Sequence, residues 1–175
     1  MNNPSVLSKM LLLYLKITGY KSKLNLNWWT KPSKANVPPK KVFQTHSVEQ
    51  NQKLGRTVWT IQPKSELTQK HILYLHGGGY SKGFINYHWQ FISKLATTLG
   101  CTITAPDYPL STSASATDVF DFLLPLYQLL IEKHGSSNLI IMGDSAGGGM
   151  ALALAELLVN KHIEQPAQLI LLSPW

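Results

Sequence analysis

The sequence has little cysteine, almost no arginine and no long apolar run. Its one cysteine, Cys101, cannot form an internal disulfide, which excludes a disulfide-stapled scaffold and fits a reducing compartment. No uninterrupted apolar run exceeds six residues, as at residues 10–15, which is too short to span a bilayer. That run also lacks the length and the small-residue cleavage site of a signal peptide, so the sequence predicts a cytoplasmic protein.

Positive charge gathers in the first part of the chain. Residues 1–70 hold 12 Lys and Arg against 2 Asp and Glu, whereas residues 71–175 hold 4 against 7. The lysines are scattered singly or in pairs, which favours a solvated basic face and argues against a nucleic-acid partner. With 175 residues, 44% of them hydrophobic and 14% charged, the chain is expected to form one domain with a full core.

The pattern changes at residue 42, which divides the chain into residues 1–41 and 42–175. Residues 5–17 carry apolar side chains at helical spacing, and residues 21–41 are basic and contain three prolines. The first part is therefore predicted to be an N-terminal helix and connector, a candidate cap. The apolar face of the helix could pack on the main body, lie over an active-site mouth or touch a membrane surface; its few charges favour the first two.

From residue 42 onward, strand signals alternate with helix signals, which indicates an α/β fold. Two β-rich runs at 42–48 and 56–61, separated by a polar turn with a glycine, predict an antiparallel hairpin. Buried strands are expected at 72–75, 101–105, 139–142 and 169–172, and helices at 89–99, 117–134 and 146–161. Such alternation predicts a mostly parallel sheet with helices on both faces, made mixed by the hairpin.

The central motif is Gly-Asp-Ser-Ala-Gly at residues 143–147, placed directly between a strand signal and a helix signal. A serine on a sharp strand-to-helix turn presents its hydroxyl to solvent as a nucleophile. Ser145 is expected in a strained backbone conformation, and Gly143 and Gly147 are expected where side chains would collide with the neighbouring strand and helix.

Three segments follow predicted strands: His-Gly-Gly-Gly-Tyr at 76–80, Asp-Tyr-Pro-Leu at 107–110, and the turn at Ser145. They should meet at the carboxyl edge of the sheet. In type and order they resemble the α/β-hydrolase fold, and within it the hormone-sensitive-lipase-like esterases. The resemblance runs from about residue 42 to residue 175, and it implies an α/β-hydrolase sheet that lacks the last strands of that fold.

The resemblance assigns roles to residues around Ser145. The backbone N–H groups of Gly78, Gly79 and Ala146 would form the oxyanion hole, which stabilises the negative charge that develops on an attacked carbonyl oxygen. His76 would fix the shape of the glycine loop through a backbone hydrogen bond, and Asp107 would brace the same loop. The arginine that usually follows Asp-Tyr is Pro109 here, so any bracing by that arginine is absent or supplied elsewhere.

The sequence offers no base for Ser145. A serine hydroxyl needs a histidine to take its proton and a carboxylate to orient that histidine, in the order Ser, Asp or Glu, His for this fold. After Ser145 the only histidine is His162, about 25 Å further along the same predicted helix. His88 lies nearer to the site but has no precedent as the base in this fold. The chain is therefore expected to be a fragment, a truncated reading frame or one half of a split gene.

These observations predict a serine hydrolase that acts on small carboxylic esters, with no metal and no cofactor, and without its Asp and His. The alternative is a non-catalytic protein that keeps the pocket to bind a small acyl or acidic ligand. The strand at 169–172 would present an exposed apolar edge, which predicts self-association. Trp28, Trp29, Tyr80 and Phe84 are candidate pocket aromatics, but ordinary core or surface packing is the favoured interpretation for each of them.

Overall fold

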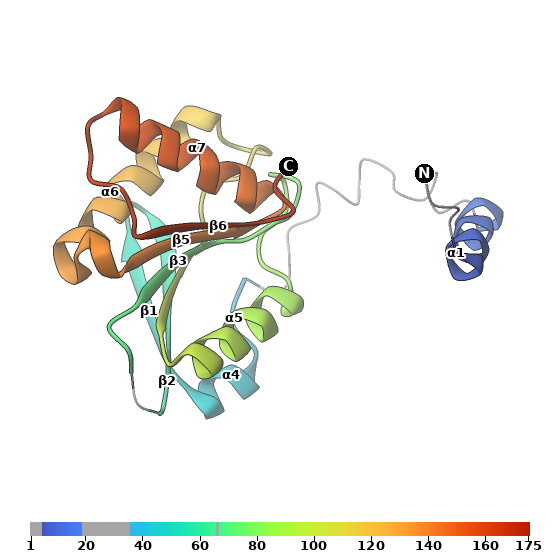
Figure 1. Ribbon diagram of the computed structural model, residues 1–175, viewed down its shortest axis with the longest axis horizontal. Coiled ribbons are helices and arrows are strands. Elements are labelled where there is room, and N and C mark those ends of the chain that lie inside the picture. Colours follow the sequence, from blue (N-terminus) through green and yellow to red (C-terminus); the bar gives the residue numbers. More distant parts are fainter. Residues whose placement is uncertain (1–4, 19–35, 66) are drawn as a thin grey trace. The chain divides into compact units, whose positions relative to one another are not determined.

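A six-stranded mixed sheet forms the centre of the molecule, as seen in the computed structural model (Figure 1). The structure describes residues 5–18, 36–65 and 67–175. The strand order is β1-β2-β4-β3-β5-β6. The strands are β1 (His46–Lys53), β2 (Arg56–Pro63), β3 (His71–Leu75), β4 (Thr102–Pro106), β5 (Leu139–Asp144) and β6 (Gln168–Leu172).

Strand direction brings the three predicted motifs to one edge of the sheet. β1 pairs with β2, and β2 with β4, in antiparallel fashion, while β4, β3, β5 and β6 run parallel. The parallel strands β3, β4 and β5 therefore end side by side at Leu75, Pro106 and Asp144. The hairpin β1–β2 is closed by Leu54 and Gly55, both at positive φ, as a two-residue hairpin turn requires.

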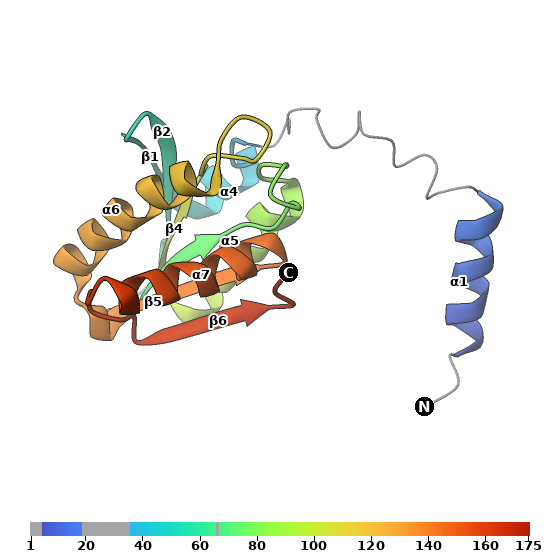
Figure 2. The same cartoon turned by 90° about the horizontal axis from the view of Figure 1, so that it is seen from above.

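Helices cover both faces of the sheet, which confirms the predicted α/β class (Figure 2). α4 (Lys40–Thr45) and α5 (Asn86–Leu99) lie on one face, and α6 (Ala116–His134) and α7 (Ala146–Asn160) on the other. Each face has its own apolar core. On the α5 side the core includes Trp59, Trp89 and Ile103, and on the α6–α7 side it includes Leu123, Ile141 and Leu154.

The expectation of a strand at residues 42–48 is wrong over its first half. Residues Lys40–Thr45 form the helix α4, and the strand begins only at His46. Pro39 is the N-cap of α4, with the extended backbone that commonly precedes a helix. The single helical turn buries Val42 in the core on the α5 side and places Phe43 edge-on to Trp59.

The chain divides into two compact units, residues Met1–Lys31 and Pro32–Trp175. The first contains the helix α1 (Val6–Ile17), which confirms the helix expected from the spacing of apolar residues. Ser5 caps it, because its side-chain oxygen accepts a hydrogen bond from the Ser8 amide. Most of the connector, with Trp28 and Trp29, lies outside the described residues. Among the helices that the structure describes, none has the length and apolar character needed to cross a membrane.

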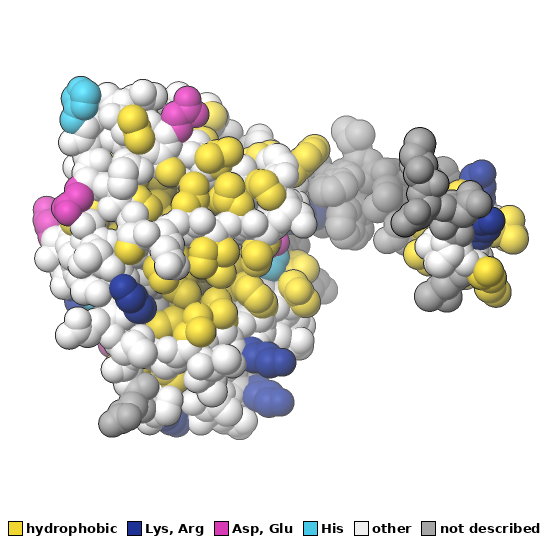
Figure 3. Space-filling view, in the orientation of Figure 1, with side chains coloured by type: hydrophobic (Ala, Val, Ile, Leu, Met, Phe, Trp, Pro, Cys, Tyr) yellow, Lys and Arg dark blue, Asp and Glu magenta, His cyan; other side chains and the backbone are white. Residues whose placement is uncertain are grey.

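Apolar side chains gather over β6 and between α7 and α5 on the face seen in Figure 3. The exposed apolar side chains of these elements include Tyr87 of α5, Leu152 of α7 and Leu172 of β6. Within the described residues β6 has one paired neighbour, β5, so its other edge carries free backbone groups. Self-association along this edge stays a prediction.

Candidate active site

Ser145 occupies the turn between β5 and α7 with a strained backbone. Its φ of 48° and ψ of −121° lie where residues with a side chain rarely occur, at a cost of about 1–3 kcal/mol. The turn is held by two hydrogen bonds, from the Ser145 amide to the Leu172 carbonyl (2.9 Å) and from the Trp175 amide to the Ser145 carbonyl (3.1 Å). In the described part of the chain no side chain binds the Ser145 hydroxyl. It faces a shallow groove of about 240 Å³ that Tyr87, Phe91 and Leu172 also line.

Two glycines of the motif lie where no side chain fits. A Cβ atom at Gly143 would collide with the backbone of Gly147 at the start of α7. A Cβ atom at Gly147 would collide with the carbonyl oxygens of Leu75 and His76, at the end of β3. The turn, the first turn of α7 and the end of β3 are therefore packed backbone to backbone.

The glycine loop after β3 makes a tight turn beside Ser145. Gly78, Gly79 and Tyr80 have φ values of 145°, 57° and 59°, and the Gly78 carbonyl accepts the amides of Ser81 and Lys82. Across the described residues, no acceptor binds the amide N–H groups of Gly78, Gly79 or Ala146. Ala146 is the first residue of α7, where the helix dipole adds partial positive charge. These donors remain available for an anion.

His76 is fully buried at the base of this loop. Its Nδ1–H donates to the Gly77 carbonyl (2.9 Å), and burial lowers the pKa of the imidazole to about 3. The ring therefore stays neutral at physiological pH. It stacks on Tyr108 with ring centroids 4.3 Å apart, and the Tyr108 hydroxyl donates to the His76 carbonyl (2.5 Å).

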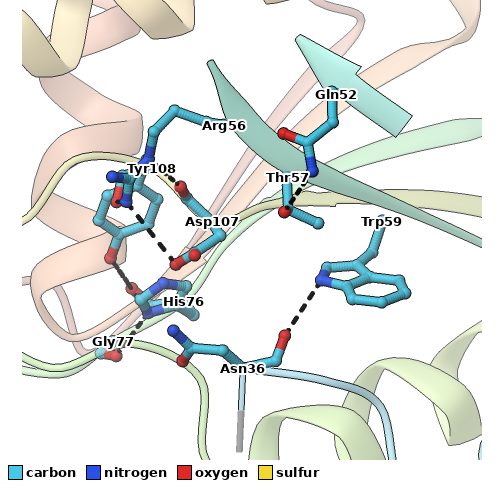
Figure 4. Close-up of polar contacts among 9 residues, drawn as sticks. All are labelled: Asn36, Gln52, Arg56, Thr57, Trp59, His76, Gly77, Asp107 and Tyr108. Carbon is cyan, nitrogen blue, oxygen red and sulfur yellow. Dashed lines mark hydrogen bonds and ion pairs between the residues drawn. The ribbon is translucent and has the colours of Figure 1, made fainter. Parts of the chain in front are cut away.

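The bracing contact expected of Asp107 is made by its neighbour Tyr108. Asp107 faces Arg56 instead, with 4.0 Å between carboxylate and guanidinium (Figure 4). Arg56 also donates to the main-chain carbonyls of Asp107 (2.8 Å) and Tyr108 (3.0 Å). This arginine, the only one in the sequence, comes from β2. It supports the segment that carries Pro109 where the resembled family carries its arginine.

Asp144 joins the turn to the glycine loop, a contact that sequence reasoning missed. Its Oδ1 accepts the Gly77 amide (2.9 Å) and the Tyr74 hydroxyl (2.5 Å), and its Oδ2 lies 3.7 Å from Nε2 of His88. Burial raises the pKa of this carboxyl, but the contacts with His88 and Tyr74 outweigh it and hold the pKa below its usual value. No local pattern could have found these partners, since 56 to 70 residues separate Asp144 from them.

The remaining histidines lie away from the site. His71 and His134 stack on each other with ring centroids 4.1 Å apart, at the opposite end of β3 and at the end of α6. His46 starts β1, and His162 follows the far end of α7. The described residues contain no group of three side chains suited to hold a metal ion. Of the candidate pocket aromatics, Phe84 is buried in the core and Tyr80 lines a cavity between α6 and α7.

Residues 72–175 match a protein family whose description is 'alpha/beta hydrolase fold'. The chain is similar to a triacylglycerol lipase of Mycobacterium tuberculosis, with 35% identity over 69% of this chain and 28% of that one. It is also similar to an esterase of Acinetobacter venetianus, with 33% identity over 66% and 38%. A crystal structure of an esterase from the bacterial hormone-sensitive lipase family superposes with a TM-score of 0.70 at 29% identity, over 75% of this chain and 44% of that one. The chain thus spans less than half the length of these relatives.

Proposed function

The chain belongs to the α/β-hydrolase fold family, among the esterases of its hormone-sensitive-lipase group, and on that basis we propose that it acts on carboxylic esters with Ser145 as nucleophile. The observation that carries the proposal is the strained turn of Ser145 next to three backbone N–H groups without an acceptor. A serine held at positive φ beside free donors has little structural use except in acyl transfer.

In the proposed reaction the Ser145 hydroxyl oxygen attacks the ester carbonyl carbon. The carbonyl oxygen becomes negatively charged, and the N–H groups of Gly78, Gly79 and Ala146 stabilise it. Collapse of this intermediate breaks the bond to the alcohol, which leaves with a proton, and water then releases the acid from Ser145. Gly143, Gly147 and His76 keep the turn and the loop in position. The reaction needs no cofactor.

The proposal requires a base for the Ser145 proton that the described residues do not provide. The His88 side chain lies beside the turn, but its Nε2 faces the Asp144 carboxylate, 3.7 Å away. His76 is neutral, buried and bonded to the loop. We therefore expect residues 1–175 to supply the nucleophile and the oxyanion hole, and a histidine with its carboxylate to come from other polypeptide.

Labelling with an alkyl fluorophosphonate tests this division of roles. Ser145 in the native chain should react faster than the same serine in chain unfolded by urea, because only the folded chain has an oxyanion hole. Imidazole added as an external base should raise the native rate further. Intact mass and peptide mapping measure the label, and Ser145→Ala should abolish it. Ser173→Ala, a serine in the same groove, is the matched control and should label normally.

One outcome would contradict the proposal, and a second would contradict only the expectation that the base comes from other polypeptide. Equal labelling rates for native and unfolded chain would show that the turn and loop give Ser145 no reactivity. The alternative, a protein that binds a small acyl or acidic ligand without catalysis, would then be favoured. Steady turnover of p-nitrophenyl acetate that Ser145→Ala abolishes would instead show that a base is present within residues 1–175.

A further inference from the structure

The helix α1 carries apolar side chains over a wide arc of its circumference. At about 100° per residue, this apolar arc runs about 200° around the helix, from Leu13 through Tyr14 to Leu15. A helix that packs on a protein usually buries a stripe little wider than about 100°. Packing on one protein face would therefore leave much of the arc in water. Its exposed members are Val6, Met10, Leu11, Leu13, Tyr14 and Ile17.

The opposite side of α1 is narrow, and all of its charge is positive. Lys9 and Lys16 are seven residues apart, so they lie nearly in line along the helix, and Ser5 and Ser8 lie on the same side. The sequence of residues 1–41 holds eight lysines and no Asp or Glu. The surface that complements α1 is therefore apolar inside and negatively charged at its boundary, as an anionic phospholipid bilayer is.

The length of α1 decides how it can bind a bilayer. Its 12 residues make a helix about 18 Å long, shorter than the hydrocarbon core of about 30 Å, so it cannot cross the membrane. It can lie along the interface, with its apolar arc among the acyl chains and its lysines at the headgroups. Hydrogen bonds at both ends lower the cost of this placement. The Ser8 amide donates to the Ser5 hydroxyl (3.2 Å), and the Thr18 hydroxyl donates to the Tyr14 carbonyl (2.8 Å).

We propose that α1 is a membrane-surface anchor that lies in the boundary of an anionic phospholipid bilayer, with Lys9 and Lys16 at the lipid phosphates. By sequence alone, the few charges of α1 favour packing on the main body. The width of the apolar arc outweighs that argument, because a fluid hydrocarbon layer can cover the whole arc and one protein face cannot. The two charges of the helix also lie on the side opposite the arc, where headgroups would meet them. The proposal is independent of the chemistry at Ser145.

Flotation of the full chain with lipid vesicles tests the electrostatic part of the proposal. Vesicles of phosphatidylcholine with about one-third phosphatidylglycerol should bind the protein more tightly than vesicles of phosphatidylcholine alone. Each lysine at an anionic surface contributes about fivefold in affinity, so Lys9→Gln combined with Lys16→Gln should weaken binding to the anionic vesicles about 25-fold. Lys94→Gln combined with Lys161→Gln removes the same charge from exposed positions of the second unit and should bind like the wild type.

Two adjacent leucines of equal exposure test the apolar part. Leu11 is 58% exposed and lies in the apolar arc, whereas Leu12 is 57% exposed and lies between Ser8 and Lys16 on the polar side. Replacement by alanine removes three carbon atoms from either residue, and each carbon buried in lipid contributes about fourfold in affinity. Leu11→Ala should therefore weaken binding to anionic vesicles about 10- to 60-fold, and Leu12→Ala less than about threefold. Circular dichroism reports whether each variant keeps the wild-type fold.

Three results would overturn the proposal. The first is the absence of flotation with anionic vesicles, and the second is equal binding to anionic and neutral vesicles. The third is an equal loss in Leu11→Ala and Leu12→Ala, which would show that charge attaches the chain without insertion of the arc. Sedimentation velocity without vesicles detects the other occupant of this face. A dimer that Leu11→Ala dissociates, in a chain that does not bind vesicles, would assign the arc to a second copy.

Discussion

Replacing Asp144 with alanine should destabilise the protein more than any other single loss of charge near the turn. The carboxylate accepts two hydrogen bonds from groups that have no other acceptor in the described structure, the Tyr74 hydroxyl and the Gly77 amide. It also faces His88 across 3.7 Å. In Asp144→Ala a buried hydroxyl and a loop amide would lose their partner together, at the point where the glycine loop meets the turn.

The expected cost follows from these two bonds. A hydrogen bond to a charged group contributes about 1.5–3 kcal/mol. The Asp144 side chain is 25% exposed to solvent, so the lower end of this energy range applies to each of the two bonds. Asp144→Ala should therefore lower the free energy of unfolding by about 3 kcal/mol at pH 7. Asp144→Asn keeps an acceptor oxygen without the charge and should cost about 1 kcal/mol.

The same bonds make the loss depend on pH. Because the folded pKa of Asp144 lies below its value in the unfolded chain, about 3.9, its contribution is present above that value and disappears as the pH falls through the folded pKa. Guanidinium unfolding at pH 7 and pH 3 measures both effects. The gap between wild type and Asp144→Ala should be smaller at pH 3 than at pH 7.

Asp121→Ala, an exposed acid on α6, is the control and should unfold like the wild type at both pH values. Hydrogen exchange of the Gly77 amide should speed up in Asp144→Ala alone. The reasoning is refuted if Asp144→Ala has wild-type stability at pH 7, or if its loss of stability persists unchanged at pH 3.

Three further perturbations probe the scaffold. Gly147→Ala places a methyl group against the carbonyl oxygen of Leu75, so it should lower the free energy of unfolding by about 3 kcal/mol and Tm by about 6–12 °C. A near-wild-type Tm would show that β3 and α7 can move apart. Arg56→Ala removes two hydrogen bonds to carbonyls and should lower the free energy of unfolding by about 1–2 kcal/mol in chemical denaturation. Arg56→Lys should recover only part of this loss, because a single ammonium group cannot reproduce the planar, forked guanidinium. Full recovery would show that the forked shape is not needed. Burial lowers the pKa of His71 to about 3 in the folded state, so stability should fall as the pH drops from about 6.5 toward 3. His71→Gln should make that dependence less steep in unfolding curves measured across this range, while the part due to His76 remains.

Most of the fold was readable from the sequence because its signals are local. The turn at Ser145 lies between an apolar strand and an apolar helix, and its flanking glycines are adjacent in the chain. The exception is residues 42–45, where β-rich composition suggested a strand. Pro39 and the burial of Val42 against the core favour one helical turn there, and that burial depends on Trp59 and Trp89 further along the chain.

The sequence by itself determined the α/β class, the order of the elements from β1 onward, the position of the strand-to-helix turn that carries Ser145, and the glycine loop after β3. Hydrophobic period and glycine placement act over a few residues, so a linear pattern is enough to reveal them. Only the tertiary structure decided that Asp144 meets His88 and Gly77, that Arg56 supports Tyr108, and that small residues of α6 and α7 enclose a cavity. Those contacts join residues about 30 to 70 positions apart, and their geometry is set by how strands and helices pack, which no local pattern records.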